Sequence, residues 1–278
     1  MELEGPLVAG PPHRGALRPD KRAKRVTVFT LFLLAVVTIY ALATMDMAGV
    51  NVPRAVSDTL RNFGTVFFQP HTRRLSVGDA FVEIVMTLGL AVLTTVFGAV
   101  VALFLGLLGA QNLAPKAVTS FIKGLVALIR AIPTILWVLI FAVAAGLGST
   151  AAVIGLSFHS VAYLTKAYAE SFEDLDRGAI DALRATGATW WQIVFQAVLP
   201  SSATYLLSWT FLRFEMNFAN AVAMGAAAGA AGIGFDLFMA SGFYFDLREV
   251  GLVTYFILAT AILLEVAATR LKSRLRER

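Results

Sequence analysis

The sequence predicts an all-α integral membrane protein with six transmembrane helices. Only 15% of its 278 residues are charged, whereas soluble domains carry about 25%. Several apolar runs reach the roughly 18 residues that a membrane-spanning helix requires. Basic residues gather beside these runs and at both ends of the chain. Lipid is therefore expected to be the solvent of most of this protein.

The chain begins with residues 1–25, which contain Gly and Pro and end in a basic run. They show no apolar periodicity, so we predict a disordered basic cytoplasmic tail. Residues 26–44 are continuously apolar and are predicted to form the first transmembrane helix. A cleaved signal peptide is the alternative, because Ala41-Leu42-Ala43 resembles a small-x-small cleavage site. Both the apolar run and the preceding tail are longer than signal peptides usually have.

Residues 45–76 are predicted to form a periplasmic segment that contains an amphipathic helix. From Pro53 to Phe68, apolar and charged residues separate onto different helical faces. The apolar face carries Val56, Leu60, Phe63, Val66 and Phe67, and the charged face carries Arg54, Asp58 and Arg61. Such a helix would lie along the outer membrane surface, and a polar loop is the alternative.

Residues 77–270 are predicted to form the core domain, followed by a basic cytoplasmic tail at 271–278. Five further apolar runs are predicted to span the membrane: 77–108, 117–145, 150–171, 193–215 and 250–270. Arg130 and Pro133 lie inside the span 117–145. They suggest a kink at which the Arg130 guanidinium donates hydrogen bonds to the carbonyls that the proline leaves free. The small residues from Ala219 to Gly234 suggest a gate or re-entrant element. A flexible connection is the alternative.

Six spans place both termini on one side of the membrane. Both termini are basic, so the positive-inside rule assigns both to the cytoplasm. The same topology places the polar segment 172–192, with Arg177 and Arg184, in the cytoplasm. Lys116 and Lys123 mark that side again. The number of spans and the placement of charge therefore agree.

Several chemistries are excluded by what the sequence lacks. There is no cysteine, and the three histidines, His13, His71 and His159, are far apart, so we predict no metal site and no catalytic residue. No phosphate-binding Gly-x4-Gly-Lys-Ser/Thr loop occurs, so this chain is not expected to hydrolyse ATP. The net charge of +5 is explained by basic membrane flanks rather than by nucleic-acid binding.

The segment Asp181 to Pro200 carries the most informative motif, in the predicted cytoplasmic region. A short helix with small residues on one face can enter a groove on a partner protein, and Ala182 and Ala185 would permit that close approach. Asp181 and Arg184 could form ion pairs at the rim. Gly187 allows the chain to turn sharply after the helix. An ordinary amphipathic loop helix is the alternative.

This segment resembles the EAA loop of ABC importer permeases: Glu-Ala-Ala, three residues, Gly, nine residues, Ile, one residue, Leu-Pro. Asp181-Ala182-Leu183, Gly187, Ala197 and Leu199-Pro200 fit the spacing, with mild departures at Asp181, Leu183 and Ala197. The resemblance implies a coupling helix near 174–190 that docks into an ATPase subunit. The coupling residues that it implies are Asp181, Ala182, Leu183, Arg184, Ala185, Gly187 and Ala188.

A narrower resemblance, to permeases of the phosphonate importer family, covers roughly residues 77–270. It rests on Glu83–Pro115, Arg130–Gly148, His159–Glu173, the Arg-Phe-Glu-x-Asn element at 213–217 and the Gly-Ile-Gly element at 232–234. The resemblance implies a type I importer fold, like that of the methionine permease, in the inner membrane of a bacterium. It also implies a second copy of this subunit, two ATPase subunits that use ATP and Mg, and a periplasmic or lipid-anchored binding protein.

The family usually carries an arginine two residues after the Asn of this element, whereas this chain has Ala219. That departure weakens the assignment to phosphonate relative to phosphate, phosphite or an amino acid.

Charged residues within spans are costly and usually face a bundle interior or a water-filled path. The candidates for a translocation pathway or gate are Arg130, Thr134, Arg213, Glu215, Asn217, Asn220 and Gly225. A structural network between helices is the alternative for Arg130, Arg213, Glu215 and Asn217.

Two other classes of membrane protein fit less well. A secondary transporter would show internal repeats with matched broken helices, and none is visible. A membrane enzyme would need clustered acids, histidines or nucleophiles, which the sequence does not show. The expected function is therefore that of a permease subunit for a phosphonate or related phosphorus oxyanion, with no cofactor bound by this chain.

Overall fold

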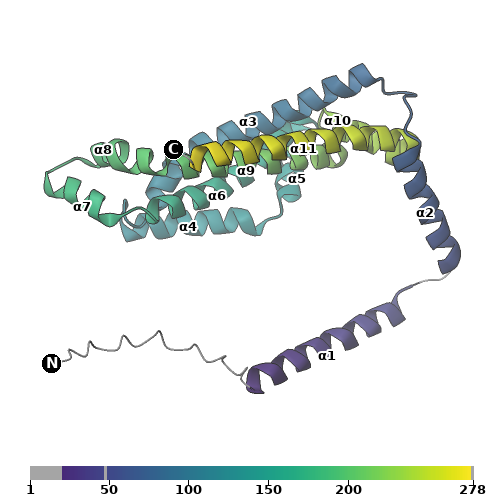
Figure 1. Cartoon of the computed structure of the whole chain (residues 1–278), viewed down its shortest axis with the longest axis horizontal. Coiled ribbons are helices and arrows are strands. Elements are labelled where there is room, and N and C mark those ends of the chain that lie inside the picture. Colours follow the sequence, from purple (N-terminus) through teal and green to yellow (C-terminus); the bar gives the residue numbers. More distant parts are fainter. Residues whose placement is uncertain (1–20, 47–48, 277–278) are drawn as a thin grey trace, which may run out of the picture. The chain divides into compact units, whose positions relative to one another are not determined.

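The computed structural model describes residues 21–46 and 49–276, and all regular secondary structure in these ranges is helical (Figure 1). The chain divides into two units, Met1–Ser57 and Asp58–Arg278. Helix α1 (Lys21–Thr44) lies in the first unit, and α2 (Val52–Phe68) crosses the boundary. The second unit contains α3 (Val77–Gly109), α4 (Lys116–Ala131), α5 (Thr134–Ala145), α6 (Ser149–Glu173), α7 (Arg177–Ala185), α8 (Trp190–Ile193), α9 (Leu199–Ala228), α10 (Ile233–Phe238) and α11 (Leu247–Arg276).

Helix α1 begins at Lys21, so residues 21–25, predicted to belong to a disordered tail, are its first turn. Residues 1–20 of that predicted tail lie outside the described residues. The apolar side chains of α1 are exposed throughout, as expected of a helix surrounded by lipid. Likewise, residues 271–276, predicted as a tail, continue α11 as helix.

Helix α2 has one apolar face, and its C-terminal turn contacts α11. The ring of Phe67 packs edge-on against Tyr255 with centroids 6.5 Å apart, and the Tyr255 hydroxyl donates to the Phe67 carbonyl. Gly251 lies directly against the carbonyl of Val66, so a side chain there would displace α2. These contacts lie within the second unit and attach the end of α2 to the N-terminal turns of α11.

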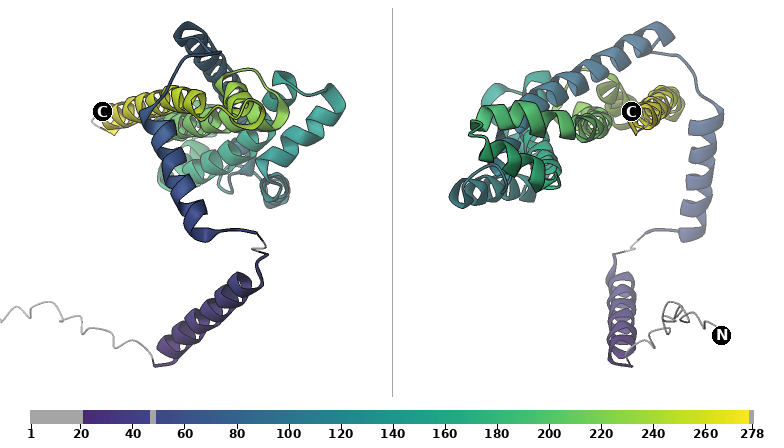
Figure 2. Two further views of the ribbon diagram at one scale, coloured as in Figure 1. Left: turned by 90° about the vertical axis from the view of Figure 1, so that its right-hand side faces the viewer. Right: turned by 60° about the vertical axis from the view of Figure 1, so that its left-hand side comes forward.

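Helix α6 is the centre of the second unit, and α3, α4, α5 and α9 pack around it (Figure 2). It approaches its neighbours closely through glycines. A Cβ on Gly98 of α3 would lie 2.8 Å from the Cβ of Ser160, and one on Gly155 would lie 2.6 Å from the Cα of Val138. Small residues at such contacts let helix backbones pack tightly without a hydrophobic drive from water.

Three described helices are long and apolar enough to cross a membrane: Arg22–Thr44, Val77–Gly109 and Leu247–Arg270. Two bent pairs, α4 with α5 and α8–α9 with α10, could raise the number to 5. The predicted span at 150–171 corresponds to α6, which is not among these candidates. Because α6 is enclosed by other helices rather than lipid, it can carry the polar residues that lower its hydropathy.

The predicted span at 117–145 is two helices rather than one, because α4 and α5 meet at 85°. Pro133 has no N–H to donate and disfavours helical geometry at the preceding Ile132, which is extended (φ −89°, ψ 123°). The carbonyl of Ile129, four residues before Pro133, instead accepts a hydrogen bond from the indole N–H of Trp137 at 3.0 Å. Trp137, and not Arg130 as predicted, therefore serves the freed carbonyl.

The predicted span at 193–215 is part of a longer helical run, from α8 through a π-helical turn (η1, Val194–Val198) to the end of α9 at Ala228. Gly229, with φ +64°, ends α9. Helix α10 follows after a bend of 52°, and Gly225 and Gly234 allow α9 and α10 to touch. The amide of Ile233 donates to Thr87 Oγ1 at 3.0 Å. A second π-helical turn (η2, Met239–Phe243) leads towards α11.

Figure 1 shows α7 and α8 at the same end of the second unit as the C-terminal end of α11, while α10 lies towards the opposite end. The ends of α3 and α6 that flank α7 also lie at that end, since α7 follows α6 directly and contacts the turn after α3.

Substitution of Gly155 by alanine should lower stability, because the added methyl group meets the backbone of Val138 and forces α5 and α6 apart. A loss of about 1–3 kcal/mol is expected for such overpacking. Gly124→Ala is the matched control, since nothing lies within 4 Å of its would-be Cβ. Thermal unfolding of the purified chain in one detergent measures both. Equal melting temperatures for the two variants would contradict the close α5–α6 contact.

Candidate docking helix and buried polar cluster

Helix α7 is a short helix with defined ends. Asp176 caps its N-terminus by accepting a hydrogen bond from the amide of Gly178 at 2.9 Å. At its C-terminus, the amide of Gly187 donates to the Arg184 carbonyl and the amide of Ala188 to the Leu183 carbonyl. Gly187 has φ +80°, a conformation that side chains other than glycine rarely adopt. The turn predicted at this glycine is therefore present.

One face of α7 is exposed and the other packs on the bundle. Ile180 is buried in a cluster with residues of α3, α6 and η1, and Leu183 packs against the same cluster. The exposed face carries Asp181, Ala182 and Ala185. Of the seven predicted coupling residues, Leu183 and Ala188 are half-buried, and Asp181, Ala182, Arg184, Ala185 and Gly187 are exposed.

Arg184 connects α7 to the turn between α3 and α4. Its Nη2 donates to the carbonyl of Asn112 at 2.6 Å, and its Nη1 donates to Asp181 Oδ1 at 3.2 Å. A second connection, which the sequence analysis missed, is Trp190, whose indole N–H donates to the carbonyl of Leu113 at 2.9 Å. A cavity of about 500 Å³ lies between α7 and residues 111–116. Helix α7 is therefore attached to the bundle by side-chain hydrogen bonds as well as by the backbone.

The same turn is also attached to the end of α6. The side-chain amide of Asn112 donates to the Phe172 carbonyl at 2.7 Å, and the backbone amide of Gln111 donates to Glu173 Oε1 at 2.8 Å. Hydrogen bonds through residues 111–113 thus join the turn after α3 to the end of α6, to α7 and to α8.

Arg213 of α9 is fully buried between α6 and α9. Its Nε donates to Ser160 Oγ at 3.0 Å, and its Nη2 lies 3.2 Å from His159 Nδ1. Its guanidinium lies 5.2 Å from the ring centroid of Tyr163, a cation–π distance. Among the described residues no carboxylate pairs with Arg213, and its Nη1 has no hydrogen-bond partner.

Asn217, one turn further along α9, extends this group of residues to α3. Its Nδ2 donates to Thr95 Oγ1 at 2.8 Å and to Ser160 Oγ at 3.0 Å, and its Oδ1 accepts from Ser160 Oγ at 3.1 Å. Both Asn217 and Ser160 are completely buried. We call Thr95, Ser160, Arg213 and Asn217 the buried polar cluster. It connects α3, α6 and α9 through side-chain hydrogen bonds.

The other predicted pathway residues lie at other positions on α4, α5 and α9. Glu215 and Asn220 are half-buried on α9, and Gly225 is buried against α10. Thr134 is half-buried at the start of α5. Arg130 is exposed near the end of α4 and lines a cavity between α4 and α6. A pathway role for all seven residues stays a prediction.

A charged group at the opposite end of the second unit was also missed, because its members are far apart in sequence. His71 Nε2 lies 3.0 Å from Asp246 Oδ2, and Glu249 Oε1 accepts from the amides of Arg74 and Leu75 at 2.9 and 2.7 Å. Partial burial by itself would raise the pKa of Asp246. Hydrogen bonds from the Glu249 and Arg248 amides and contact with His71 outweigh it, so the pKa is lowered. This group attaches the segment before α3 to the start of α11.

No group of three or more His, Cys, Asp or Glu residues that could hold a metal ion occurs in residues 21–46 and 49–276. The acidic residues near α7 form ion pairs or caps rather than a ligand set. The arrangement is that of a helical bundle with a short, partly exposed helix at one end and a buried polar cluster.

The family model described as "Binding-protein-dependent transport system inner membrane component" matches residues 102–278. The Phosphate-import permease protein PhnE of Mycolicibacterium smegmatis is 29% identical over 66% of this chain, but the match spans only 35% of that protein. The phosphite transport system permease protein PtxC of Stutzerimonas stutzeri is 33% identical over 64% of this chain and 65% of its own length. The chain thus covers less than two thirds of each of these relatives.

The fold is similar to that of a solved structure of the MetNI methionine ABC transporter in an inward-facing conformation. The TM-score is 0.61 with 23% sequence identity, and the similarity covers 69% of this chain and 94% of that chain. At this identity the comparison concerns the fold alone.

Replacement of Trp190 by phenylalanine, or of Arg184 by methionine, should loosen α7, because each removes a donor to the α3–α4 turn. Hydrogen–deuterium exchange in residues 110–116 and 177–186 should rise in both variants. Arg177→Met is the matched control, since Arg177 is exposed on the same helix and, within the described residues, makes no side-chain hydrogen bond to that turn. Unchanged exchange in both test variants would show that these two hydrogen bonds do not hold α7.

Proposed function

Because the chain belongs to the binding-protein-dependent transport system inner membrane component family, we propose that it is the membrane-spanning permease subunit of an ATP-driven importer. It is a multi-pass inner-membrane protein by family and by its apolar helices. The observation that carries the proposal is α7: a short helix with an exposed small-residue face, attached to the ends of α3, α4 and α6. Its spacing within Asp181 to Pro200 fits the EAA pattern.

The proposed topology has six transmembrane segments with both termini in the cytoplasm. The segments are α1, α3, the bent α4–α5 pair, α6, the α8–α9 run and α11. Support comes from the basic residues at both ends of the sequence and from the shared end of α7, α8 and the C-terminal part of α11 in Figure 1. Helix α10 would then be a re-entrant element on the outer side.

The proposed partners are a second copy of this chain, two ATPase subunits and a periplasmic or lipid-anchored binding protein. ATP and Mg would be bound by the ATPase subunits, since this sequence has no phosphate-binding loop. Exposed Ala182 and Ala185 offer a surface on which a partner's groove could close without displacing large side chains.

Motion at α7 has two routes into the membrane helices. The first is through the hydrogen bonds that Arg184 and Trp190 donate to the turn between α3 and α4. The second is through the backbone, which continues from Gly187 through α8 and η1 into α9. Since α3, α6 and α9 are joined by the buried polar cluster, they are expected to move as one body, while the α4–α5 bend and the α9–α10 turn absorb the change.

The proposed substrate is a phosphonate or a related phosphorus oxyanion. The support is that relatives named for phosphate and phosphite import are 29% and 33% identical to this chain. An amino acid is the second candidate, since the fold is shared with a methionine transporter. Ala219, where the resembling family usually has arginine, is exposed on α9. The identity of the anion therefore has to be measured.

The test is co-expression of the chain with candidate ATPase and binding-protein subunits, followed by pull-down and ligand-stimulated ATPase assays in lipid vesicles. We expect a stable complex whose ATP hydrolysis rises when binding protein is loaded with phosphonate, phosphite or phosphate. If no ATPase associates with the chain, the proposal fails. If only amino-acid-loaded binding protein stimulates hydrolysis, the second substrate replaces the first.

Gly187→Val should uncouple ATP hydrolysis from transport while leaving membrane insertion intact, because a β-branched residue cannot hold φ +80°. Substrate uptake should fall by about tenfold or more, the effect of roughly 1.4 kcal/mol of lost coupling free energy. Gly124→Val is the control, since it has open space around it on α4. Uptake at the unsubstituted level in Gly187→Val vesicles would argue against docking through α7.

A further inference from the structure

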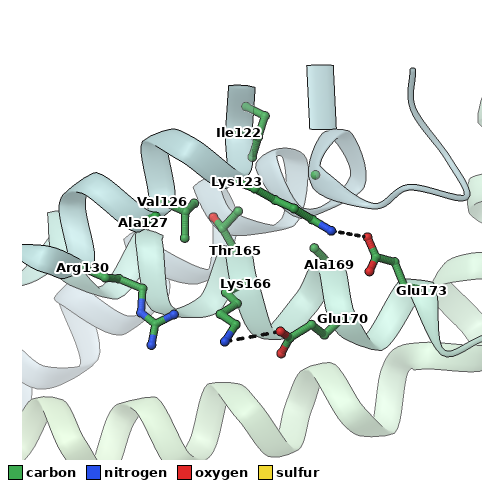
Figure 3. A pocket seen from close by; sticks show the side chains of 11 residues that line it. Ile122, Lys123, Val126, Ala127, Arg130, Thr165, Lys166, Ala169, Glu170 and Glu173 are labelled. Carbon is green, nitrogen blue, oxygen red and sulfur yellow. Dashed lines mark hydrogen bonds and ion pairs between the residues drawn. The ribbon is translucent and has the colours of Figure 1, made fainter. Parts of the chain in front are cut away.

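A charged cavity of about 320 Å³ lies between α4 and α6 (Figure 3). Its lining combines apolar residues of α3, α4 and α6 with Thr165 and five charged residues: Lys123 and Arg130 of α4, and Lys166, Glu170 and Glu173 of α6. In Figure 3 the charged side chains follow one another along the two helices, from the Lys123–Glu173 pair to Arg130. The volume of the cavity lies at the lower end of the range that ligand pockets usually have, roughly 300–1,000 Å³.

The cavity extends from the end of the bundle that carries α7 towards the part of α4 expected to lie in the membrane. Arg130 lies 14 residues after Lys116, the first residue of α4, which is roughly 21 Å along a helix that rises about 1.5 Å per residue. Glu173, at the other end of the cavity, is the last residue of α6 and adjoins the turn before α7. Charges at such depth are costly in lipid, so this surface is expected to face water in the assembled transporter.

Two of the three cations in the cavity are neutralised by neighbouring acids. Lys123 Nζ lies 2.9 Å from Glu173 Oε1, and Lys166 Nζ lies 3.4 Å from Glu170 Oε1. Arg130 has no such pair in the described part of the chain, and the residue is exposed. The cavity therefore carries one positive charge in excess of its carboxylates. A guanidinium presents paired N–H groups that suit the oxygen atoms of a tetrahedral phosphorus oxyanion.

Thr165 supplies a second feature that indicates a ligand. Its side chain is only 1% exposed, and its Oγ1 has no hydrogen-bond partner in the described residues. Other buried threonines in the bundle, such as Thr94 and Thr95, donate to carbonyls of their own helix. An unpartnered buried hydroxyl costs stability unless something satisfies it. Because Thr165 lines the cavity, a rotation of its side chain would bring this buried hydroxyl to a bound oxyanion.

We propose that this α4–α6 cavity binds one small tetrahedral phosphorus oxyanion, held by Arg130 and Thr165. The inference rests on the proposed function: the cavity is the place on the cytoplasmic side where the transported anion binds before release. The Lys123–Glu173 and Lys166–Glu170 pairs border the site and limit its net charge, so binding is weak enough for the anion to leave. The narrow volume excludes large anions.

Thiol protection tests the site directly, because the natural chain has no cysteine. In the full chain carrying Ala127→Cys, purified in detergent, a small negatively charged thiosulfonate reports access to the cavity. At a concentration about nine times its Kd, phosphite, phosphate or methylphosphonate should slow the reaction about tenfold relative to sodium chloride of equal ionic strength. Leu128→Cys is the matched control, since Leu128 is exposed and lies outside the cavity lining. A cysteine at this position should therefore not be protected by the oxyanion.

Second substitutions in the Ala127→Cys chain identify the ligand-binding groups. Arg130→Gln should abolish protection and Thr165→Val should weaken it, whereas Thr94→Val, at a buried threonine that bonds its own helix, should leave it unchanged. Each rate is compared with and without oxyanion in the same variant. Absence of protection in the parent chain, or equal protection after Arg130→Gln, would overturn the inference.

Lipid headgroups carry the same phosphate chemistry, so the experiment is repeated in nanodiscs with and without phosphatidylglycerol. Protection by the small oxyanions in detergent and in neutral nanodiscs is the expected result. Protection by phosphatidylglycerol alone would assign the cavity to lipid and overturn the inference. Oxyanion-stimulated ATP hydrolysis without thiol protection would sink only this cavity. Thiol protection without any ATPase partner would sink only the proposed function.

Discussion

The fold depends on the hydroxyl of Ser160, at the point where three helices meet. This one oxygen donates to Asn217 and accepts from Arg213 and Asn217, which uses the hydrogen-bonding capacity of a serine fully. Gly98 lies directly against the same residue, so the closest approach of α3 to α6 coincides with the buried polar cluster. In lipid, helix association comes from close packing and from such hydrogen bonds. Removing one partner would leave a buried arginine unsatisfied, which is far costlier than losing one contact.

The rigid centre explains why the breaks in the bundle lie where they do. Pro133 bends α4 away from α5, and Trp137 satisfies the carbonyl that the proline leaves free, so the bend keeps no unsatisfied carbonyl at Ile129. The turn after Gly229 folds α10 onto α9, with glycines in contact. Both breaks lie outside the buried polar cluster. A body of α3, α6 and α9 with bends at its edges suits a protein that must change the access of a path without unfolding.

Sequence patterns predicted the features that depend on neighbouring residues. Apolar runs gave α1, α3 and α11, and the spacing from Asp181 to Gly187 gave a short helix that ends in a glycine turn. Contacts between distant residues could not be found this way. The indole of Trp190 reaches Leu113, and Glu249 reaches the amides before α3, across separations of 77 and 174–175 residues. Hydropathy also fails for α6, because that scale assumes a lipid neighbour and α6 has protein neighbours on several sides.

The position of charge bears on how such a chain could handle an anion. Arg213 is the most buried cation of the bundle, yet its Nε and Nη2 are engaged with Ser160 and His159, so it is committed to holding helices together. Ala219, two residues after Asn217, is exposed on α9 and carries no charge where the resembling family usually has arginine. A cation missing from one exposed position must be supplied by another if an anion is to cross. Arg130, which is exposed and lines the same cavity as the ion-paired Lys166 and Lys123, is a residue that meets this requirement.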